Sequence, residues 1–185
     1  MIIKKYFDGK VILFQQNKFK DKRGFFSEIY NLKELKKIGI KELFLQDNFS
    51  YSNKKGVIRG LHFQCPPNQQ SKLIRVLNGK ILDVVVDIRK GSKTYGKHET
   101  FIISRQNWRQ LFISSGFAHG FCTLEDKTDI EYKVSSYFSK KSERTIKWND
   151  SLLGINWKIN ISNAILSSKD KQAIDFSKLN SPFKV

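Results

Sequence analysis

Short runs of β-branched and aromatic residues, separated by turn-forming residues, recur along most of the chain. Such runs favour β-strands, because branched and aromatic side chains pack well on a pleated surface. Asn78-Gly79 separates two of the runs and predicts a β-hairpin, since both residues tolerate positive φ angles. Many short strands at near-regular spacing predict a mainly β sandwich or barrel. The predicted strands cover residues 11–15, 25–31, 43–49, 57–63, 73–77, 81–88, 98–103, 110–113, 121–124 and 129–134.

Helical signals are few and short. Apolar residues at helical spacing over residues 32–38 precede Gly39, which fits the end of a helix. The segment Ser167-Ser-Lys-Asp170 has the pattern of a capping box and predicts a second short helix. The sequence contains no internal repeat and no long linker. We therefore expect one domain over residues 1–185, with a short helical tail from about residue 164.

Several polar residues stand within the predicted strands. Alternation over residues 57–63 places His62 on the face opposite its apolar neighbours. Asp83 and Asp87 share their strand faces with apolar residues, so at least one of them is expected inside the fold and paired, because burying a lone carboxylate is costly. Lys72 opens the adjoining strand. A histidine, an ammonium group and carboxylates could therefore converge in one cavity.

The charge of the chain is unusually positive. Its 185 residues include 34 Lys and Arg against 17 Asp and Glu, which gives a formal net charge of +17. The basic residues are spread over turns and expected solvent faces. We rank a solvated surface first as their explanation, an anionic small ligand second and nucleic acid third. The hydrophobic content of 39% is that of a folded globular protein.

Cysteine use and the first residues bear on the compartment. Cys65 and Cys122 are the only cysteines and follow no metal-ligand spacing, so they are expected to be reduced thiols. The opening residues lack the apolar core of a secretory signal. No apolar run is long enough to cross a membrane. We expect a cytoplasmic protein with no membrane partner.

An ordered series of motifs carries a family resemblance. The motifs are Asp21-Lys-Arg-Gly-Phe-Phe-Ser-Glu28, Gln46-Asp-Asn48, Arg59-Gly-Leu-His-Phe-Gln64, Gln70-Ser-Lys72, Asp83-Val-Val-Val-Asp87, Gly116-Phe-Ala-His-Gly-Phe121, Glu131-Tyr-Lys133 and Trp148-Asn-Asp150. This series resembles the dTDP-4-dehydrorhamnose 3,5-epimerase family. The resemblance implies a homodimeric, cupin-type jelly roll, or double-stranded β-helix, with a few short helices. It also implies an isomerase that acts on nucleoside-diphosphate 4-keto sugars, in the supply of polysaccharide precursors, without a metal or other cofactor.

The implied reaction is epimerisation beside a ketone. A 4-keto group acidifies the hydrogens on C3 and C5, so a base can remove one as a proton and leave an enolate on O4. Inversion then needs an acid on the opposite face and a cation or donor beside the oxyanion. By the resemblance, His62 is the base and Asp170 orients its imidazole. Tyr132 is the implied acid and Lys72 the implied enolate stabiliser.

The resemblance also assigns contacts to the substrate. Arg59 and His119 are expected to line the pocket beside His62. Strict alternation places Arg59 opposite His62, so both reach one ligand only if the strand is irregular, and we predict a bulge at Gly60. The nucleotide is expected to contact Gln46, Asn48, Arg59, Phe138 and Glu143, with Arg23, Phe26 and Glu28 supplied by the partner subunit.

Three departures from the family pattern leave the substrate open. Ser114-Ser115 replaces a common Pro-Glu, Ser71 stands where a smaller residue is usual, and Phe138 stands where tyrosine is frequent. None of them belongs to the implied proton relay, but each can alter the pocket. The sugar could be a dTDP-linked 4-keto-6-deoxyhexose or a GDP-linked 4-keto-hexose or heptose. Inversion could take place at C3, at C5 or at both.

Two other classes of function remain at this point. A metal-dependent cupin oxygenase or isomerase usually needs a His-X-His pair, which the sequence lacks, but His62 and His119 with acids could form a facial triad. A non-enzymatic module that binds anionic ligands would draw on the positive charge. Bound metal would identify the first class, and salt-sensitive binding without chemistry would identify the second.

Overall fold

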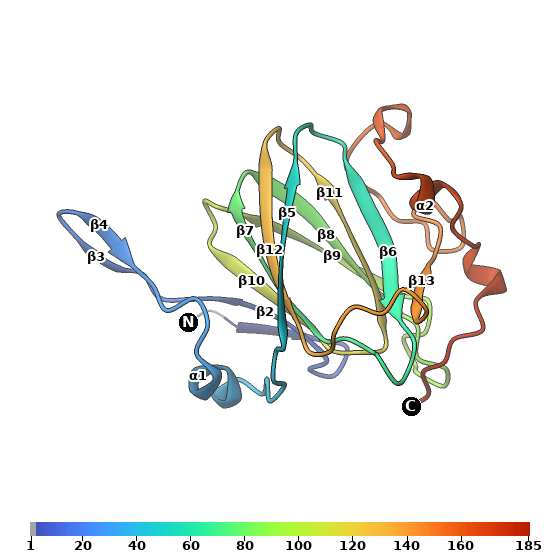
Figure 1. Ribbon diagram of the computed structural model, residues 1–185, viewed down its shortest axis with the longest axis horizontal. Coiled ribbons are helices and arrows are strands. Elements are labelled where there is room, and N and C mark those ends of the chain that lie inside the picture. Colours follow the sequence, from blue (N-terminus) through green and yellow to red (C-terminus); the bar gives the residue numbers. More distant parts are fainter. Residues whose placement is uncertain (1–2) are drawn as a thin grey trace.

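Two antiparallel sheets face each other in the computed structural model, which describes residues 3–185 (Figure 1). The six-stranded sheet has the order β1 (Ile3–Tyr6), β2 (Val11–Gln15), β10 (Arg109–Ile113), β7 (Lys72–Asn78), β12 (Thr128–Val134) and β5 (Gln46–Ser52). The five-stranded sheet has the order β13 (Glu143–Thr145), β6 (Ile58–Gln64), β11 (Phe117–Thr123), β8 (Lys80–Asp87) and β9 (His98–Ser104). The predicted mainly β sandwich is confirmed.

The main apolar core lies between the sheets. Ile74 and Leu111 of the six-stranded sheet and Val85 of the five-stranded sheet are all at most 1% exposed within it. A second cluster covers the outer face of the five-stranded sheet and includes Trp148 and Trp157. A third, beneath the first helix, covers the outer face of the six-stranded sheet. One part of the interior is left for polar side chains, and the cavity described below lies there.

Both predicted helices are present, and both are short. Helix α1 (Leu32–Lys37) is capped by Asn31 and ends before Gly39, whose φ of +104° suits glycine. Helix α2 (Ser168–Lys171) begins at Ser167, whose side chain accepts a hydrogen bond from the Asp170 backbone. The 3₁₀ helices span Ile161–Asn163 and Phe176–Lys178. A two-stranded hairpin, β3 (Phe19–Asp21) and β4 (Gly24–Phe26), projects from the body (Figure 1).

The predicted hairpin at Asn78-Gly79 is wrong. Strand β7 pairs with β10 and β12, whereas β8 pairs with β11 and β9, so the turn carries the chain from one sheet to the other. Asn78 and Gly79 instead pack against the connection between β11 and β12, which also passes from one sheet to the other. Asn78 donates to the Lys127 carbonyl, and a Cβ on Gly79 would lie 2.4 Å from Thr128 Oγ1. Lys72 and Asp83 consequently lie on facing sheets.

Other strand limits differ from the predictions. The strand predicted over 25–31 ends at Phe26, where the chain turns back and Ser27 donates to the Asn17 carbonyl. Strand β5 begins three residues later than predicted and β11 four residues earlier. Strands β1, β3 and β13 were not predicted, because short exposed or highly charged segments lack the apolar alternation that marks a strand.

The predicted irregularity at Gly60 is confirmed. Two residues of β6, Gly60 and Leu61, lie opposite the single residue Gly120 of β11, between the pairs His62–His119 and Arg59–Phe121. The extra residue turns Arg59 and His62 to the same side, and both line one cavity. Only glycine fits at the bulge, since a Cβ on Gly60 would lie 2.5 Å from the Gly120 Cα.

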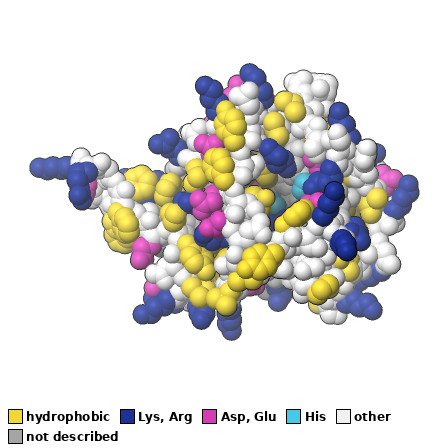
Figure 2. Space-filling view, in the orientation of Figure 1, with side chains coloured by type: hydrophobic (Ala, Val, Ile, Leu, Met, Phe, Trp, Pro, Cys, Tyr) yellow, Lys and Arg dark blue, Asp and Glu magenta, His cyan; other side chains and the backbone are white. Residues whose placement is uncertain are grey.

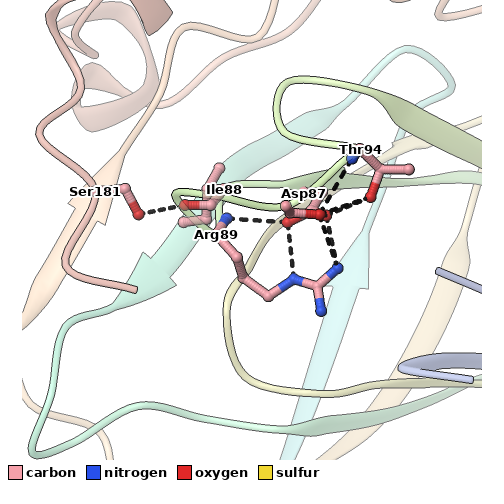
Figure 3. A network of polar contacts seen from close by, with 6 residues as sticks. Asp87, Ile88, Arg89, Thr94 and Ser181 are labelled. Carbon is pink, nitrogen blue, oxygen red and sulfur yellow. Dashed lines mark hydrogen bonds and ion pairs between the residues drawn. The ribbon is translucent and has the colours of Figure 1, made fainter. Parts of the chain in front are cut away.

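The far end of β8 is fixed by a buried carboxylate. Asp87 is fully buried and accepts hydrogen bonds from the Arg89 guanidinium at 2.9 and 2.6 Å (Figure 3). Ser92 and Thr94 hydroxyls donate to the same carboxylate, each at 2.6 Å. These contacts hold the pKa of Asp87 below its usual range although burial acts to raise it. Every oxygen of Asp87 is therefore used within the loop that follows the strand.

Candidate active site

A cavity of about 880 Å³ opens between the two sheets and is lined by β5, β6, β7, β11, β12 and the segment leading into α2. Figure 2 shows histidine at the floor of a hollow, with Lys and Arg side chains around it. The cavity collects ten of the thirteen predicted site residues: Gln46, Asn48, Arg59, His62, Lys72, His119, Tyr132, Phe138, Glu143 and Asp170.

His62 and Asp170 form a close pair on one wall. His62 Nε2 lies 2.6 Å from Asp170 Oδ1, and the Asp170 side chain is only 2% exposed. The second carboxylate oxygen of Asp170 accepts from the Ser167 hydroxyl at 2.7 Å. The capping of α2 and the orientation of His62 thus depend on the same serine and aspartate.

The ionisation of this pair fixes the tautomer of the histidine. Burial acts to raise the pKa of Asp170, but hydrogen bonds from His62 and Ser167 hold it below its usual range. Burial lowers the pKa of His62, and the hydrogen bond to Asp170 opposes that change only in part. A neutral imidazole beside an ionised carboxylate must carry its proton on Nε2, because the carboxylate can only accept. Nδ1 is then the basic nitrogen.

Tyr132 and Lys72 approach the cavity from the other sheet. Tyr132 lies on β12 and Lys72 on β7, whereas His62 lies on β6 of the facing sheet. Burial raises the pKa of Tyr132, which therefore stays protonated near neutral pH. Burial lowers the pKa of Lys72 to about 8, with Asp83 the first of the charges that oppose it. A neutral base, a phenol and an ammonium group thus surround one space from two sides.

A second buried pair, His119 and Asp83, lies behind the first. His119 sits opposite His62 in the pairing of β11 with β6, and its Nε2 is 2.9 Å from Asp83 Oδ2. Asp83 is fully buried. Its inward placement follows from the strand alternation, but the sequence did not identify His119 as its partner, because that contact joins two strands 36 residues apart in the chain.

The outer part of the cavity carries an ordered loop. Gln46 accepts a hydrogen bond from the Phe138 backbone at 3.1 Å, and Gln64 accepts one from Ser139 at 2.7 Å. These bonds present the Phe138 ring at the cavity edge, 56% exposed. On the other side Lys169 donates to Glu143 at 2.8 Å. The sequence missed Lys169, whose one available signal was its place directly before Asp170.

Three predicted residues lie away from this cavity. Arg23, Phe26 and Glu28 are on or beside the projecting hairpin and are exposed. Phe26 is 67% exposed, and the Arg23 side chain contacts only Asp21 of the same hairpin. The described chain does not bring them to its own cavity.

The alternatives raised by the sequence find little support in this geometry. Within residues 3–185 no three His, Cys, Asp or Glu side chains are grouped as ligands for one metal ion. His62 and His119 are each directed at a separate carboxylate instead of at a common point. The same residues include no helix that is long and apolar enough to cross a membrane.

The sandwich and its cavity define a cupin-type jelly-roll enzyme with titratable side chains on opposite walls. Residues 8–178 match the family model described as dTDP-4-dehydrorhamnose 3,5-epimerase. The chain belongs to this family of epimerases.

Similar proteins support the same assignment. A dTDP-4-dehydrorhamnose 3,5-epimerase of Shigella flexneri is 47% identical over 161 residues, or 86% of this chain and 87% of the relative. The crystal structure of the Bacillus anthracis enzyme with TDP and PPi bound has a TM-score of 0.91 at 44% identity, covering 95% of this chain and 99% of that one. The Legionella pneumophila enzyme in complex with dTDP-4-keto-L-rhamnose has a TM-score of 0.90 at 39% identity, covering 97% and 94%.

Proposed function

We propose that this epimerase inverts C3 and C5 of a dTDP-linked 4-keto-6-deoxyhexose, in the supply of sugars for polysaccharides. The observation that carries the proposal is the placement of His62 and Tyr132 on facing walls of one cavity that Lys72 also lines. Inversion through a planar enolate needs a base and an acid on opposite faces, and this arrangement supplies both. The ligands named for the Bacillus and Legionella relatives support a thymidine nucleotide.

Four residues of the cavity have separate roles in the proposed reaction. Nδ1 of His62 removes the proton from C3 or C5, and Asp170 stabilises the imidazolium that forms. The electron pair moves onto O4, where the Lys72 ammonium stabilises the enolate. Tyr132 then gives its proton to the carbon from the opposite face. Solvent returns a proton to the tyrosinate and takes one from His62, so that the site is restored.

The nucleotide is assigned to the outer part of the cavity. Phe138 stands at its edge and offers a ring face for the base. Gln46, Asn48, Glu143 and Arg59 line the same cavity, and Arg59 is proposed to bind the diphosphate.

The enzyme is proposed to act as a homodimer in the cytoplasm. The hairpin of β3 and β4 projects with exposed Phe19 and Phe26, and it carries Arg23 away from its own cavity (Figure 1). A second copy could receive this hairpin, so that Arg23, Phe26 and Glu28 reach the neighbour's nucleotide. Free cysteines at Cys65 and Cys122 agree with a reducing compartment.

Deuterium exchange tests the proposal. The chain is incubated in D₂O with a panel of dTDP- and GDP-linked 4-keto-hexoses and heptoses, and the sugars are analysed by NMR. We expect deuterium at C3 and C5 of the dTDP-linked 4-keto-6-deoxyhexose, with product of inverted configuration. Exchange confined to a GDP-linked sugar would change the substrate assignment, and no exchange with any member would overturn the function.

A further inference from the structure

Asp83 is a fully buried carboxylate that contacts the cavity-lining His119, and the reaction above leaves its role unexplained. Its Oδ2 is bound by His119 at 2.9 Å, whereas Oδ1 has no hydrogen-bond partner among residues 3–185. A buried carboxylate oxygen without a partner is costly and calls for a compensating charge.

Lys72 lies on the facing sheet, and its positive charge acts on Asp83 together with that of His119. Its ammonium lines the cavity and makes no side-chain hydrogen bond or ion pair within the described part of the chain. Asp83 is nevertheless the strongest of the charges that favour its protonated form. The titratable and charged groups that line the cavity with Lys72 or act on its charge are Tyr51, Arg59, His62, Asp83, His119, Tyr132, Glu143, Lys169 and Asp170.

The absence of an ion pair between Asp83 and Lys72 suits a lysine that must bind a developing oxyanion. A carboxylate in direct contact with the ammonium would compete with the substrate oxygen for its protons. A carboxylate held one layer deeper by His119 favours the charged lysine and leaves its protons free. Burial raises the pKa of Asp83, and the charges of His119 and Lys72 act against that rise.

We propose that Asp83 is a positioning residue whose ionised carboxylate orients His119 and keeps the Lys72 ammonium charged without binding it. The inference rests on the proposed function for its meaning in catalysis. The effect of the Asp83 charge on the protonation of Lys72 does not depend on any substrate.

Asp87 offers a matched control on the same strand. Both aspartates are fully buried, but the carboxylate of Asp87 is bound by Arg89, Ser92 and Thr94, outside the residues that line the cavity (Figure 3). Asp87→Asn should therefore weaken the fold and leave Lys72 unchanged. Asp83→Asn removes the same charge with the same change of shape.

The decisive measurement is an NMR titration of isotopically labelled lysines in the ligand-free protein. We expect one lysine, identified by its loss in Lys72→Arg, to titrate near pH 8. In Asp83→Asn its midpoint should fall by about one pH unit, and in Asp87→Asn it should stay in place. Asp83→Ser makes the same prediction if the asparagine variant does not fold. An unchanged midpoint in a folded Asp83 variant would overturn the proposal and leave a structural role only.

The rate profile provides the catalytic readout. Asp83→Asn should lower kcat at pH 8 by roughly fivefold and move the alkaline limb of kcat to lower pH, with KM little changed. A profile that keeps its alkaline limb in place would contradict the role of Asp83 in catalysis. If the wild-type chain shows no exchange with any sugar, the proposed function fails, and the lysine titration still decides what Asp83 does.

Discussion

His62 Nε2 lies 2.6 Å from Oδ1 of Asp170, although 108 positions separate the two residues in the chain. The contact exists because the capped helix α2 returns over β6 and points its third residue at the cavity. The carboxylate fixes the imidazole tautomer, and in the proposed reaction it offers a negative charge to the imidazolium.

Replacing Asp170 by Asn should lower kcat by roughly 100-fold or more, because the imidazolium loses its counter-charge. The hydrogen bond to Asp170 raises the pKa of His62 against the effect of burial. Its loss lowers that pKa further, so the acid limb of kcat/KM, where the base becomes protonated, should move to lower pH. A pH–rate profile measures both effects. Asp175→Asn is the control, since among residues 3–185 the Asp175 side chain forms ion pairs only with the exposed Lys147 and Lys178. An acid limb that stays in place in Asp170→Asn would count against the pair.

Replacing Tyr132 by Phe should separate proton exchange from inversion. His62 can still remove a proton and return a deuteron on the same face, whereas delivery on the opposite face loses its acid. We expect product formation to fall by roughly 100- to 10,000-fold while deuterium still enters the unreacted sugar. Tyr137→Phe, which changes an exposed ring outside the cavity lining, should behave as wild type. Equal loss of exchange and inversion would assign Tyr132 a different role.

Replacing Phe138 by Ala should weaken nucleotide binding. Loss of a stacked ring corresponds to a rise in KM and in the Kd of dTDP of roughly tenfold or more, with kcat little affected. Calorimetry with dTDP measures the affinity directly. Phe138→Tyr keeps the ring and should bind as wild type does. Normal dTDP affinity in the alanine variant would place the base elsewhere in the cavity.

Mixing two inactive variants should restore activity if the hairpin completes the partner's site. A His62→Ala subunit still offers Arg23, and an Arg23→Ala subunit still offers His62. Random reassortment would give one complete site in half of the dimers, or about a quarter of wild-type activity. Sedimentation tests whether the chain forms a dimer. The activity of the mixed sample tests whether the hairpin of one subunit completes the site of the other. A dimer that shows no recovery after subunit exchange would place Arg23 outside the site.

Replacing Gly60 by Ala should destabilise the fold by about 2 kcal/mol or more, because the new methyl meets the Gly120 backbone. Denaturant unfolding measures the loss. Gly91→Ala is the matched control, since Gly91 also has a positive φ angle but no atom lies within 4 Å of its added Cβ. Equal losses in both variants would mean that the φ angle alone, and not the close approach of β6 to β11, requires glycine.

Sequence patterns predicted most of the sandwich because its strands alternate apolar and polar residues around clear turns. These patterns failed where the turn type favoured by the local sequence differs from the strand arrangement required by packing of the core. Asn78-Gly79 has hairpin chemistry, but the apolar faces of β7 and β8 are buried against each other across the core, which places the strands in different sheets.

For the site, too, residues within sequence motifs were predicted, whereas contacts set by strand register were not. His62, Lys72, Tyr132 and Asp170 come from motifs in the chain, and the structure brings all four to one cavity. The Asp83–His119 contact depends on the register between β8 and β11, which no local pattern encodes. The assignment of Arg23, Phe26 and Glu28 to a partner subunit stays a prediction.

The most direct test of the account is solvent exchange at C3 and C5 of a dTDP-linked 4-keto-6-deoxyhexose by the wild type and by His62→Asn. Asparagine keeps the polarity and much of the volume of the side chain but cannot accept the proton. The account predicts deuterium at both carbons with the wild type and a loss of at least roughly 100-fold at both with His62→Asn. Exchange at the wild-type rate in the folded variant would show that another group removes the proton, and would contradict the assignment of His62 as the base.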